Sequence, residues 1–250
     1  MELSMELIKP KYYQNNIYYC DTFEKNPKCI VINGSKYFRF IDIIYIPTKT
    51  ELLTNEQIID INDLRNKYFH SLINKDVNEH VRKVVSDTVK RVSAQTILEF
   101  GAGYRPLFHA ESFNHFTYYI ADLNPKAVSE CKSKGFDSFL FNDNSLLPLS
   151  DESIDLVFSI FVFQFRISFN QIKEFSRILR KKGVILANVY RRNFKSKSNL
   201  LKAFNKEGFY FDIISDPEKI CKNHEYWCLY KEPNSPLVKE IIQLIKSLVK

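Results

Sequence analysis

The fold of this chain is decided by the stretch Thr96-Ile97-Leu98-Glu99-Phe100-Gly101-Ala102-Gly103-Tyr104-Arg105-Pro106. An apolar run ends in an acid and then in two glycines one residue apart, a pattern typical of a buried parallel strand that turns sharply into a helix. A residue without a Cβ allows positive φ angles and lets a ligand approach the main chain closely. Only six glycines occur in the 250 residues, so two in one loop are informative. The stretch predicts a ligand-binding turn at the end of a strand.

Two classes of nucleotide-binding protein carry such a turn, and the residues around the glycines distinguish them. A dinucleotide-binding turn follows the pattern Gly-x-Gly-x-x-Gly, but Pro106 stands at the position of the third glycine. This residue disfavours a nicotinamide oxidoreductase. The acid-x-Gly-x-Gly pattern that begins at Glu99 resembles instead the S-adenosylmethionine (SAM) loop of the class I methyltransferases. The loop alone also fits a structural turn, so the spacing downstream has to decide.

The composition is that of an ordinary globular protein. Hydrophobic residues make up 45% and charged residues 26% of the chain, and its length suffices for one α/β domain with an extension. The formal net charge of +7 permits nucleic acid, a phosphorylated metabolite or an anionic surface as a partner, although a general lysine bias also explains it. No stretch approaches the roughly 20 apolar residues that span a bilayer, so we expect a cytoplasmic protein without membrane insertion.

The five cysteines are expected to be reduced thiols, because an odd number does not suit a disulfide framework. The segment Cys221-x-x-His224-x-x-x-Cys228 contains metal-binding residue types, but its spacing matches no standard zinc pattern. The sequence therefore predicts no metal site.

The chain is expected to comprise three parts. Residues 1–54 contain β-branched and aromatic runs on either side of Asn33-Gly34, which predict a small antiparallel sheet around a hairpin turn. Residues 55–94 carry apolar residues at helical spacing and predict a helical segment that covers the cofactor cleft. Residues 95–250 predict the cofactor-binding domain. In class I methyltransferases an aromatic residue of a leading helix lies near the cofactor, which makes Tyr68 or Phe69 a candidate lid, with core packing as the alternative.

The second strand is expected to end in an acid that suits a nucleoside. A helix should begin over residues 107–112, and an apolar strand over residues 116–121 then ends at Asp122. This acid lies about 20 residues beyond the glycines, where a nucleoside-binding α/β fold needs a carboxylate for the ribose hydroxyls. The alternative to ribose binding is that Asp122 is a solvent-exposed cap of the next helix, because Asn124-Pro125 is a helix start signal.

The resemblance becomes specific after the third strand, residues 138–141. The segment from Leu147 to Ser159 is similar to the Asp-x-x-x-Leu-Pro-Phe-x-Asp-x-Ser-Phe-Asp-x-Val segment of class I SAM-dependent methyltransferases, in the branch like the ubiquinone and menaquinone biosynthesis enzymes. In that family the acid after strand three binds the adenine amino group and the next backbone amide meets a ring nitrogen, which implies these roles for Asp143 and Asn144. Residues 172–186 resemble the family's next helix and fifth strand, with Gly183 expected to end the helix.

The resemblance covers about residues 95–230 and implies a Rossmann-like α/β fold. We expect a seven-stranded, mostly parallel sheet with helices on both faces, preceded by the small β-rich and helical extension. The implied cofactor is SAM. The implied cofactor-binding residues are Glu99, Gly101, Ala102, Gly103, Asp122, Leu123, Asp143, Asn144, Ser159 and Phe161.

Candidates for acceptor binding follow strands four and five. Aromatic residues such as Phe161 and Phe163 suit the sulfonium cation of the cofactor, with core packing as the alternative. Strand five should end at Tyr190, and cations follow it at the edge where an open parallel sheet binds ligands. They suit a phosphate or carboxylate of the acceptor, with a solvated loop as the alternative. The candidate acceptor-binding residues are Tyr68, Phe163, Tyr190, Arg191 and Arg192.

Together these patterns predict a SAM-dependent methyltransferase. The acceptor is expected to be a small metabolite, a sugar or a natural product, and no catalytic base is assigned because some acceptors need none. Without an Asn-Pro-Pro-Tyr motif, methylation of adenine N6 or of protein glutamine is less expected. Two alternatives stay open: a SAM-binding fold without catalysis that serves as a regulatory or scaffold subunit, and a methyltransferase that acts on RNA.

Overall fold

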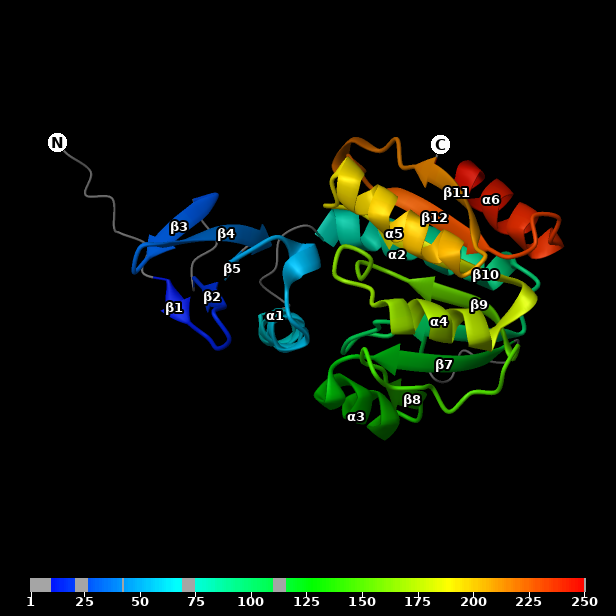
Figure 1. Ribbon diagram of the computed structural model, residues 1–250, viewed down its shortest axis with the longest axis horizontal. Coiled ribbons are helices and arrows are strands. Elements are labelled where there is room, and N and C mark those ends of the chain that lie inside the picture. The colour runs from blue at the N-terminus through cyan, green and yellow to red at the C-terminus, as the bar shows by residue number, and fades with distance from the viewer. Residues whose placement is uncertain (1–9, 21–26, 42, 69–74, 110–115, 250) are drawn as a thin grey trace. The chain divides into compact units, whose positions relative to one another are not determined.

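The chain divides into two compact units, Met1–Ile73 and Asn74–Lys250 (Figure 1). The computed structural model describes residues 10–20, 27–41, 43–68, 75–109 and 116–249. The helical segment expected over residues 55–94 forms two helices, α1 (Asn55–Lys67) in the first unit and α2 (Lys75–Arg91) in the second. The candidate lid residue Phe69 lies outside the described residues.

The first unit contains the small antiparallel sheet that the sequence predicts. Its strands run in the order β1-β2-β5-β4-β3. Asn33 and Gly34 join β3 to β4 with positive φ angles of 49° and 77°, which confirms the predicted hairpin turn. The strands are β1 (Lys11–Tyr12), β2 (Tyr18–Tyr19), β3 (Cys29–Ile32), β4 (Ser35–Ile41) and β5 (Ile44–Ile46), and the short 3-10 helix η1 (Thr50–Leu52) follows.

Helix α1 belongs to the first unit because its polar contacts are made there. The helix begins with a capping box between Thr54 and Gln57. The buried Asp60 accepts hydrogen bonds from the side chains of Gln14 and Asn15, at 2.8 Å for Asn15. These bonds fix α1 against the loop between β1 and β2.

The second unit is built on a seven-stranded sheet with the strand order β11-β12-β10-β9-β6-β7-β8 (Figure 1). Strand β12 is antiparallel to both of its neighbours, and all other pairs are parallel. The predicted seven-stranded, mostly parallel fold is confirmed. Its elements after α2 are β6 (Thr96–Phe100), β7 (Thr117–Asp122), α3 (Pro125–Ser133), β8 (Asp137–Leu140), β9 (Ile154–Ser159), α4 (Phe169–Ile178), β10 (Leu179–Val189), α5 (Phe194–Lys206), β11 (Tyr210–Ser215), η4 (Lys219–Cys221), β12 (Glu225–Tyr230) and α6 (Pro236–Leu248).

Successive residues of the central strands enter two separate hydrophobic cores, one on each face of the sheet. In β6, Ile97 packs with residues of α2 and α6, whereas Leu98 packs with residues of α4 and α5. This alternation follows from the two-residue period of a strand, and burial on both faces explains why the strands are almost wholly apolar. Helices cover both faces, as expected. Within the described residues, no helix has the length and apolar character needed to cross a membrane.

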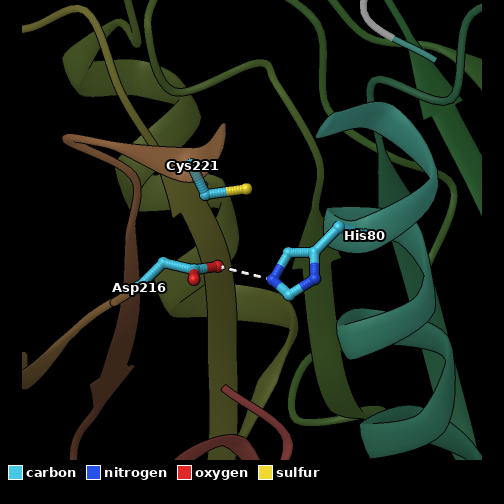
Figure 2. A group of neighbouring side chains, drawn as sticks. All are labelled: His80, Asp216 and Cys221. Carbon is cyan, nitrogen blue, oxygen red and sulfur yellow. Dashed lines mark hydrogen bonds and ion pairs between the residues drawn. The ribbon is translucent and has the colours of Figure 1, made fainter. Parts of the chain in front are cut away.

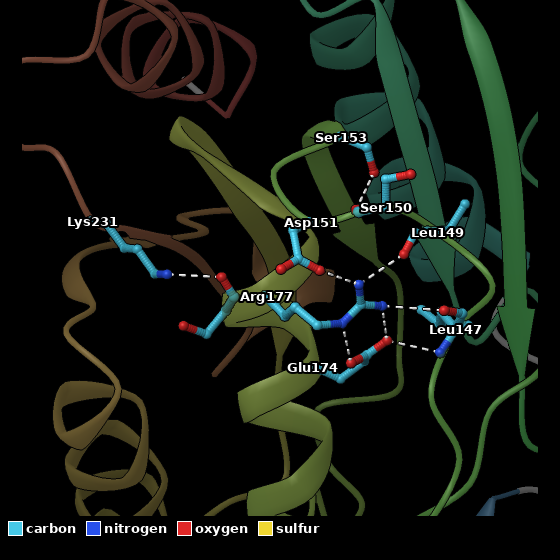
Figure 3. Close-up of polar contacts among 9 residues, drawn as sticks. Leu147, Leu149, Ser150, Asp151, Ser153, Glu174, Arg177 and Lys231 are labelled. Carbon is cyan, nitrogen blue, oxygen red and sulfur yellow. Dashed lines mark hydrogen bonds and ion pairs between the residues drawn. The ribbon is translucent and has the colours of Figure 1, made fainter.

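The segment that resembles the family's Leu-Pro motif is held by one arginine of α4. Arg177 donates to both carboxylate oxygens of the buried Glu174, to the carbonyl oxygens of Leu147 and Leu149, and to Asp151 (Figure 3). Glu174 also accepts from the Leu147 amide at 2.7 Å. The network ties the loop before β9 to α4 and thereby sets where β9 begins.

Two local predictions are wrong. Gly183 does not end a helix, because α4 stops at Ile178 and Gly183 lies within β10. A Cβ at this position would come within 2.9 Å of the Asp155 carbonyl oxygen, so the glycine permits close contact between strands.

The second wrong prediction is the helix expected to begin at residue 107. Residues 107–109 form no helix, and residues 110–115 lie outside the described residues. The amide of Leu107 donates to the Glu99 carboxylate, and this bond fixes the loop in another conformation.

Candidate functional site

The glycine loop turns sharply at the carboxyl end of β6. Gly101 and Gly103 have φ angles of 80° and 57°, and the Gly101 amide donates to the Ala121 carbonyl oxygen of β7 at 2.7 Å. A Cβ on Gly101 would lie 2.2 Å from Cγ2 of Val162, which follows β9. Both the backbone angle and the packing therefore require glycine at this position. Ala102 between the glycines is half-buried.

Glu99 anchors the far end of this loop. Its Oε2 atom accepts hydrogen bonds from the Leu107 amide at 2.8 Å and from the Tyr118 hydroxyl. Burial raises the pKa of Glu99 to about 7, although both hydrogen bonds oppose the rise. Tyr118 lies on β7, so the acid joins two neighbouring strands and the loop between them. Contact of Glu99 with the methionine end of SAM stays a prediction.

Asp122 connects the end of β7 to the glycine loop. Its Oδ2 accepts from the Gly103 amide at 2.7 Å, and its Oδ1 accepts from the Asn124 amide at 2.8 Å. Burial raises the pKa of Asp122, and these backbone hydrogen bonds oppose the rise. A carboxylate has about four acceptor sites, so the side chain can accept a further hydrogen bond beside those from the amides of Gly103, Asn124 and Leu123. Leu123 follows at the same edge and is half-buried.

The two residues predicted to bind adenine follow β8 and already have protein contacts. The Asp143 carboxylate pairs with Arg166, a residue that the sequence did not single out. The backbone amide of Asn144 donates to Oδ1 of Asn142 at 2.9 Å. Both groups lie near the surface, where such contacts are weak and exchangeable.

The residues predicted after β9 differ in burial. Ser159 is buried and donates to the Phe100 carbonyl oxygen at 2.8 Å, so it joins β9 to β6. Phe163 is fully buried and stacks on Phe204 in the core. Phe161 is half-buried and adopts a positive φ of 61°, a strained conformation for an aromatic residue that is typical of functional sites.

The candidates after β10 fall into two groups. Arg191 is exposed, has a φ of 61°, and lies 5.4 Å from the centre of the Tyr190 ring. Arg192 instead donates to the carbonyl oxygens of Phe163 and Phe165 and to the Ser196 hydroxyl. Its guanidinium therefore has a structural role in fixing the loop after β9.

Tyr68 belongs to the first unit, directly after α1. Its ring lies 5.6 Å from that of Tyr19. A place for Tyr68 near the cofactor stays a prediction, as do the binding roles of the other candidates. His109, which follows the glycine loop, is exposed.

A polar cluster around Tyr190 was missed by sequence reasoning. Gln164 donates to the Tyr190 hydroxyl at 2.7 Å and to the Phe161 carbonyl oxygen at 2.8 Å. The His224 ring stacks on Tyr190 at 4.6 Å, and Asn188 donates to its Nδ1 at 3.4 Å. Burial lowers the pKa of His224, so the ring is neutral at pH 7.

This cluster contains two buried acceptor atoms, Oε1 of Gln164 and Oδ1 of Asn188, that have no hydrogen-bond partner among the described residues. Such groups are rare because each costs about 1–3 kcal/mol. His224 precedes Glu225, which pairs with Val189 at the end of β10, so the cluster lies at the carboxyl edge of the sheet. A partial signal for it was present in the sequence, since Asn188 and Tyr190 end a predicted strand and Gln164 belongs to the aromatic run after another, whereas His224 precedes a strand.

Comparison with known proteins identifies the family of this site. The family model described as a methyltransferase domain matches residues 98–187, from within β6 to within β10. Over these residues the chain is similar to the class I SAM-dependent methyltransferases. No curated protein sequence matches the chain.

Solved structures share the fold of this methyltransferase domain at low sequence identity. The [4+2]-cyclase SpnF is 14% identical with a TM-score of 0.53, and the match covers 72% of this chain and 96% of that one. The CMeT domain of the citrinin polyketide synthase is 16% identical with a TM-score of 0.51, over 72% of this chain and 57% of that one. A chain of the complex between the Haloferax volcanii Trm112 methyltransferase activator and a methyltransferase is 14% identical with a TM-score of 0.48. This match covers 62% of this chain and 91% of that one.

The two likenesses with TM-scores above 0.5 show the fold alone. In all, 831 chains of solved structures match this one, and folds this common host many functions, so the fold does not select an acceptor.

Proposed function

We propose that the protein transfers a methyl group from SAM to an acceptor bound at the carboxyl edge of the sheet. One observation carries the proposal. The glycine turn after β6 and the buried acid at the end of β7 are joined by the hydrogen bond from Gly103 to Asp122. An α/β sheet that binds a nucleoside needs these two features side by side, with the ligand beyond the carboxyl ends of its strands.

The residues present suit the cofactor. Asp122 keeps acceptor capacity for a ribose hydroxyl, and the two glycines leave the backbone of the loop open to close approach. Asp143 and the Asn144 amide would bind adenine after exchanging their present partners. When bound, SAM supplies an activated methyl group on a sulfonium, and the protein positions the acceptor in line with it.

The acceptor is proposed to be a small molecule with a hydroxyl or amino group. The unpartnered oxygens of Gln164 and Asn188 accept hydrogen bonds, so they suit a donor-bearing acceptor. His224 lies in the same cluster. Because its Nδ1 accepts from Asn188, the neutral ring carries its hydrogen on Nε2, which can donate to an oxygen or nitrogen of the acceptor. Phe161 and Tyr190 provide the aromatic faces beside it.

Calorimetric titration of the full chain with SAM and S-adenosylhomocysteine tests the proposal. Asp122→Ala should weaken both ligands about 10–100-fold, because it removes a hydrogen bond to a charged group. Asp122→Asn keeps one acceptor and should lose less. The matched control is Asp137→Ala, an exposed acid at the opposite end of β8, which should bind as the wild type does. If the intact protein bound neither ligand, the proposal would be wrong.

The two alternatives are separated by a second assay that follows radiolabelled methyl groups. A SAM-binding subunit without catalysis would bind SAM but label neither metabolites nor RNA. An RNA methyltransferase would label RNA, with exposed cations such as Arg191 and Lys195 as its contacts. Labelling of small molecules alone supports the proposed acceptor class.

A further inference from the structure

Three side chains with metal-binding atoms meet on the α2 side of β11 and β12. They are His80 of α2, Asp216 directly after β11, and Cys221 of η4, and they point toward one another (Figure 2). His80 Nε2 donates to Asp216 Oδ2 at 2.9 Å, and the three potential ligand atoms lie within 4.8 Å of one another. No role in cofactor or acceptor binding has been given to any of them.

The donor set selects the class of metal. An imidazole nitrogen, a carboxylate oxygen and a sulfur suit Zn²⁺, whereas Mg²⁺ and Ca²⁺ prefer oxygen ligands alone. With zinc bonds of about 2.0–2.3 Å, ligand atoms of a tetrahedral site lie about 3.3–3.6 Å apart. His80 Nε2 and Asp216 Oδ2 lie 2.9 Å apart and would separate by about 0.5 Å, while the Cys221 sulfur would move closer by at most about 1 Å.

The surroundings of Asp216 support a built site. Its Oδ2 also accepts from the Tyr226 hydroxyl at 3.0 Å, and its Oδ1 accepts from the Glu218 amide at 3.1 Å. Such outer contacts orient a carboxylate for metal binding. The Asp216 side chain is fully buried, but that of His80 is 21% exposed, which gives an ion access from solvent.

We propose that His80 Nε2, Asp216 and Cys221 Sγ bind one Zn²⁺ ion, with water as the fourth ligand, and that the ion fastens the loop between β11 and β12 to α2. The ion takes the place of the hydrogen between His80 and Asp216, and the ring tautomerises through solvent so that this hydrogen moves from Nε2 to Nδ1. Burial raises the pKa of the Cys221 thiol to about 11, so this thiol is protonated in the metal-free protein. It releases one proton to the solvent when it binds the metal.

The proposed ligands are not the three residues with metal-binding types that lie close together in the sequence. Cys221, His224 and Cys228 stand close together in the sequence, but Nδ1 of His224 accepts from Asn188, and Cys228 is buried in the core. His80 lies 136 residues from Asp216, so sequence spacing could not reveal this cluster.

The test uses the full chain without a histidine tag, stripped of metal. Calorimetric titration with Zn²⁺ should show one site, and Co²⁺ should produce the charge-transfer absorption band of a cobalt–thiolate bond. Changes in outer contacts alone alter metal affinity about 10–100-fold, so Cys221→Ala should weaken Zn²⁺ at least about 100-fold and abolish the band. The matched control is Cys228→Ala, which removes an equally buried thiol and should leave both signals intact.

A second variant guards against loss of the fold. His80→Gln keeps an amide donor for Asp216 at a partly exposed position and removes the imidazole ligand, so it should fold and lose Zn²⁺ binding at least about 10-fold. The proposal is overturned if the wild-type chain binds no Zn²⁺, if no thiolate band forms, or if Cys228→Ala loses binding as Cys221→Ala does.

Discussion

Glutamine at position 99 should make the second unit more stable at neutral and alkaline pH but not at acid pH. The Glu99 pKa rises from an ordinary 4.5 to about 7 because the carboxyl is buried. Between these values the unfolded chain loses the proton while the folded protein keeps it. The free energy of unfolding therefore falls as pH rises through this window, and the loss is complete only above the folded pKa.

The magnitude follows from the two pKa values. At about 1.4 kcal/mol for each tenfold change in proton affinity, the wild type loses about 2.5 kcal/mol through this group between pH 5 and pH 8. Both hydrogen bonds of Glu99 end on Oε2, so a glutamine oxygen can accept both, and the variant resembles the protonated acid. The stability of Glu99→Gln relative to wild type should therefore rise by about 2.5 kcal/mol across this range.

Urea unfolding followed by the fluorescence of Trp227 measures this difference. Trp227 is the single tryptophan and is buried in β12, so it reports on the second unit. Glu79→Gln, at an exposed position of α2, is the control and should show no such trend. The reasoning would be refuted if the free energy of unfolding of Glu99→Gln minus that of wild type stayed constant with pH or fell toward pH 8.

Three further substitutions distinguish residues that affect SAM binding from residues that stabilise the fold. Gly101→Ala should lose SAM binding and about 1–3 kcal/mol of stability, whereas Gly34→Ala, with a similar φ but open space around it, should leave SAM affinity unchanged. Arg177→Met leaves Glu174 buried without its partner and should cost about 3–5 kcal/mol in urea unfolding, with most of this recovered in the double variant that also carries Glu174→Leu. Arg166→Ala frees Asp143 and should tighten SAM by up to about fivefold in calorimetry, since an exposed pair is worth at most about 1 kcal/mol. Arg180→Ala, which breaks an ion pair between Arg180 of β10 and Asp155 of β9, should not change the affinity for SAM. Weaker SAM binding in Arg166→Ala would contradict the assignment of Asp143.

The glycine turn and the acid of the candidate cofactor site were predictable as local structure, because their residues lie at the ends of consecutive strands. Gly101, Gly103 and Asp122 are placed by local signals: glycine where φ must be positive, and an acid where an apolar strand ends. Helix starts such as Asn124-Pro125 were likewise readable, because Asn124 caps α3 with its own side chain.

The rest depends on contacts that no local pattern encodes. The sequence could not show that Arg166 pairs with Asp143, or that Arg192 turns inward to two carbonyl oxygens. Gly183 was misjudged for the same reason. Its place within β10 is set by the close approach of Asp155 on the neighbouring strand, whereas a glycine after a helical pattern usually marks the end of a helix.

The loop between β11 and β12 connects the two proposals made for this protein. The Asp216 amide donates to the His224 carbonyl oxygen at 3.0 Å, so a metal ion on Asp216 and Cys221 would also fix the backbone that carries His224. Most of the proposed cofactor contacts follow β6, β7 and β8, on the other side of β9 and β10. If both proposals hold, removal of zinc raises the KM for the acceptor and leaves the Kd for SAM unchanged. A change in the Kd for SAM would mean that the loop supports the cofactor instead.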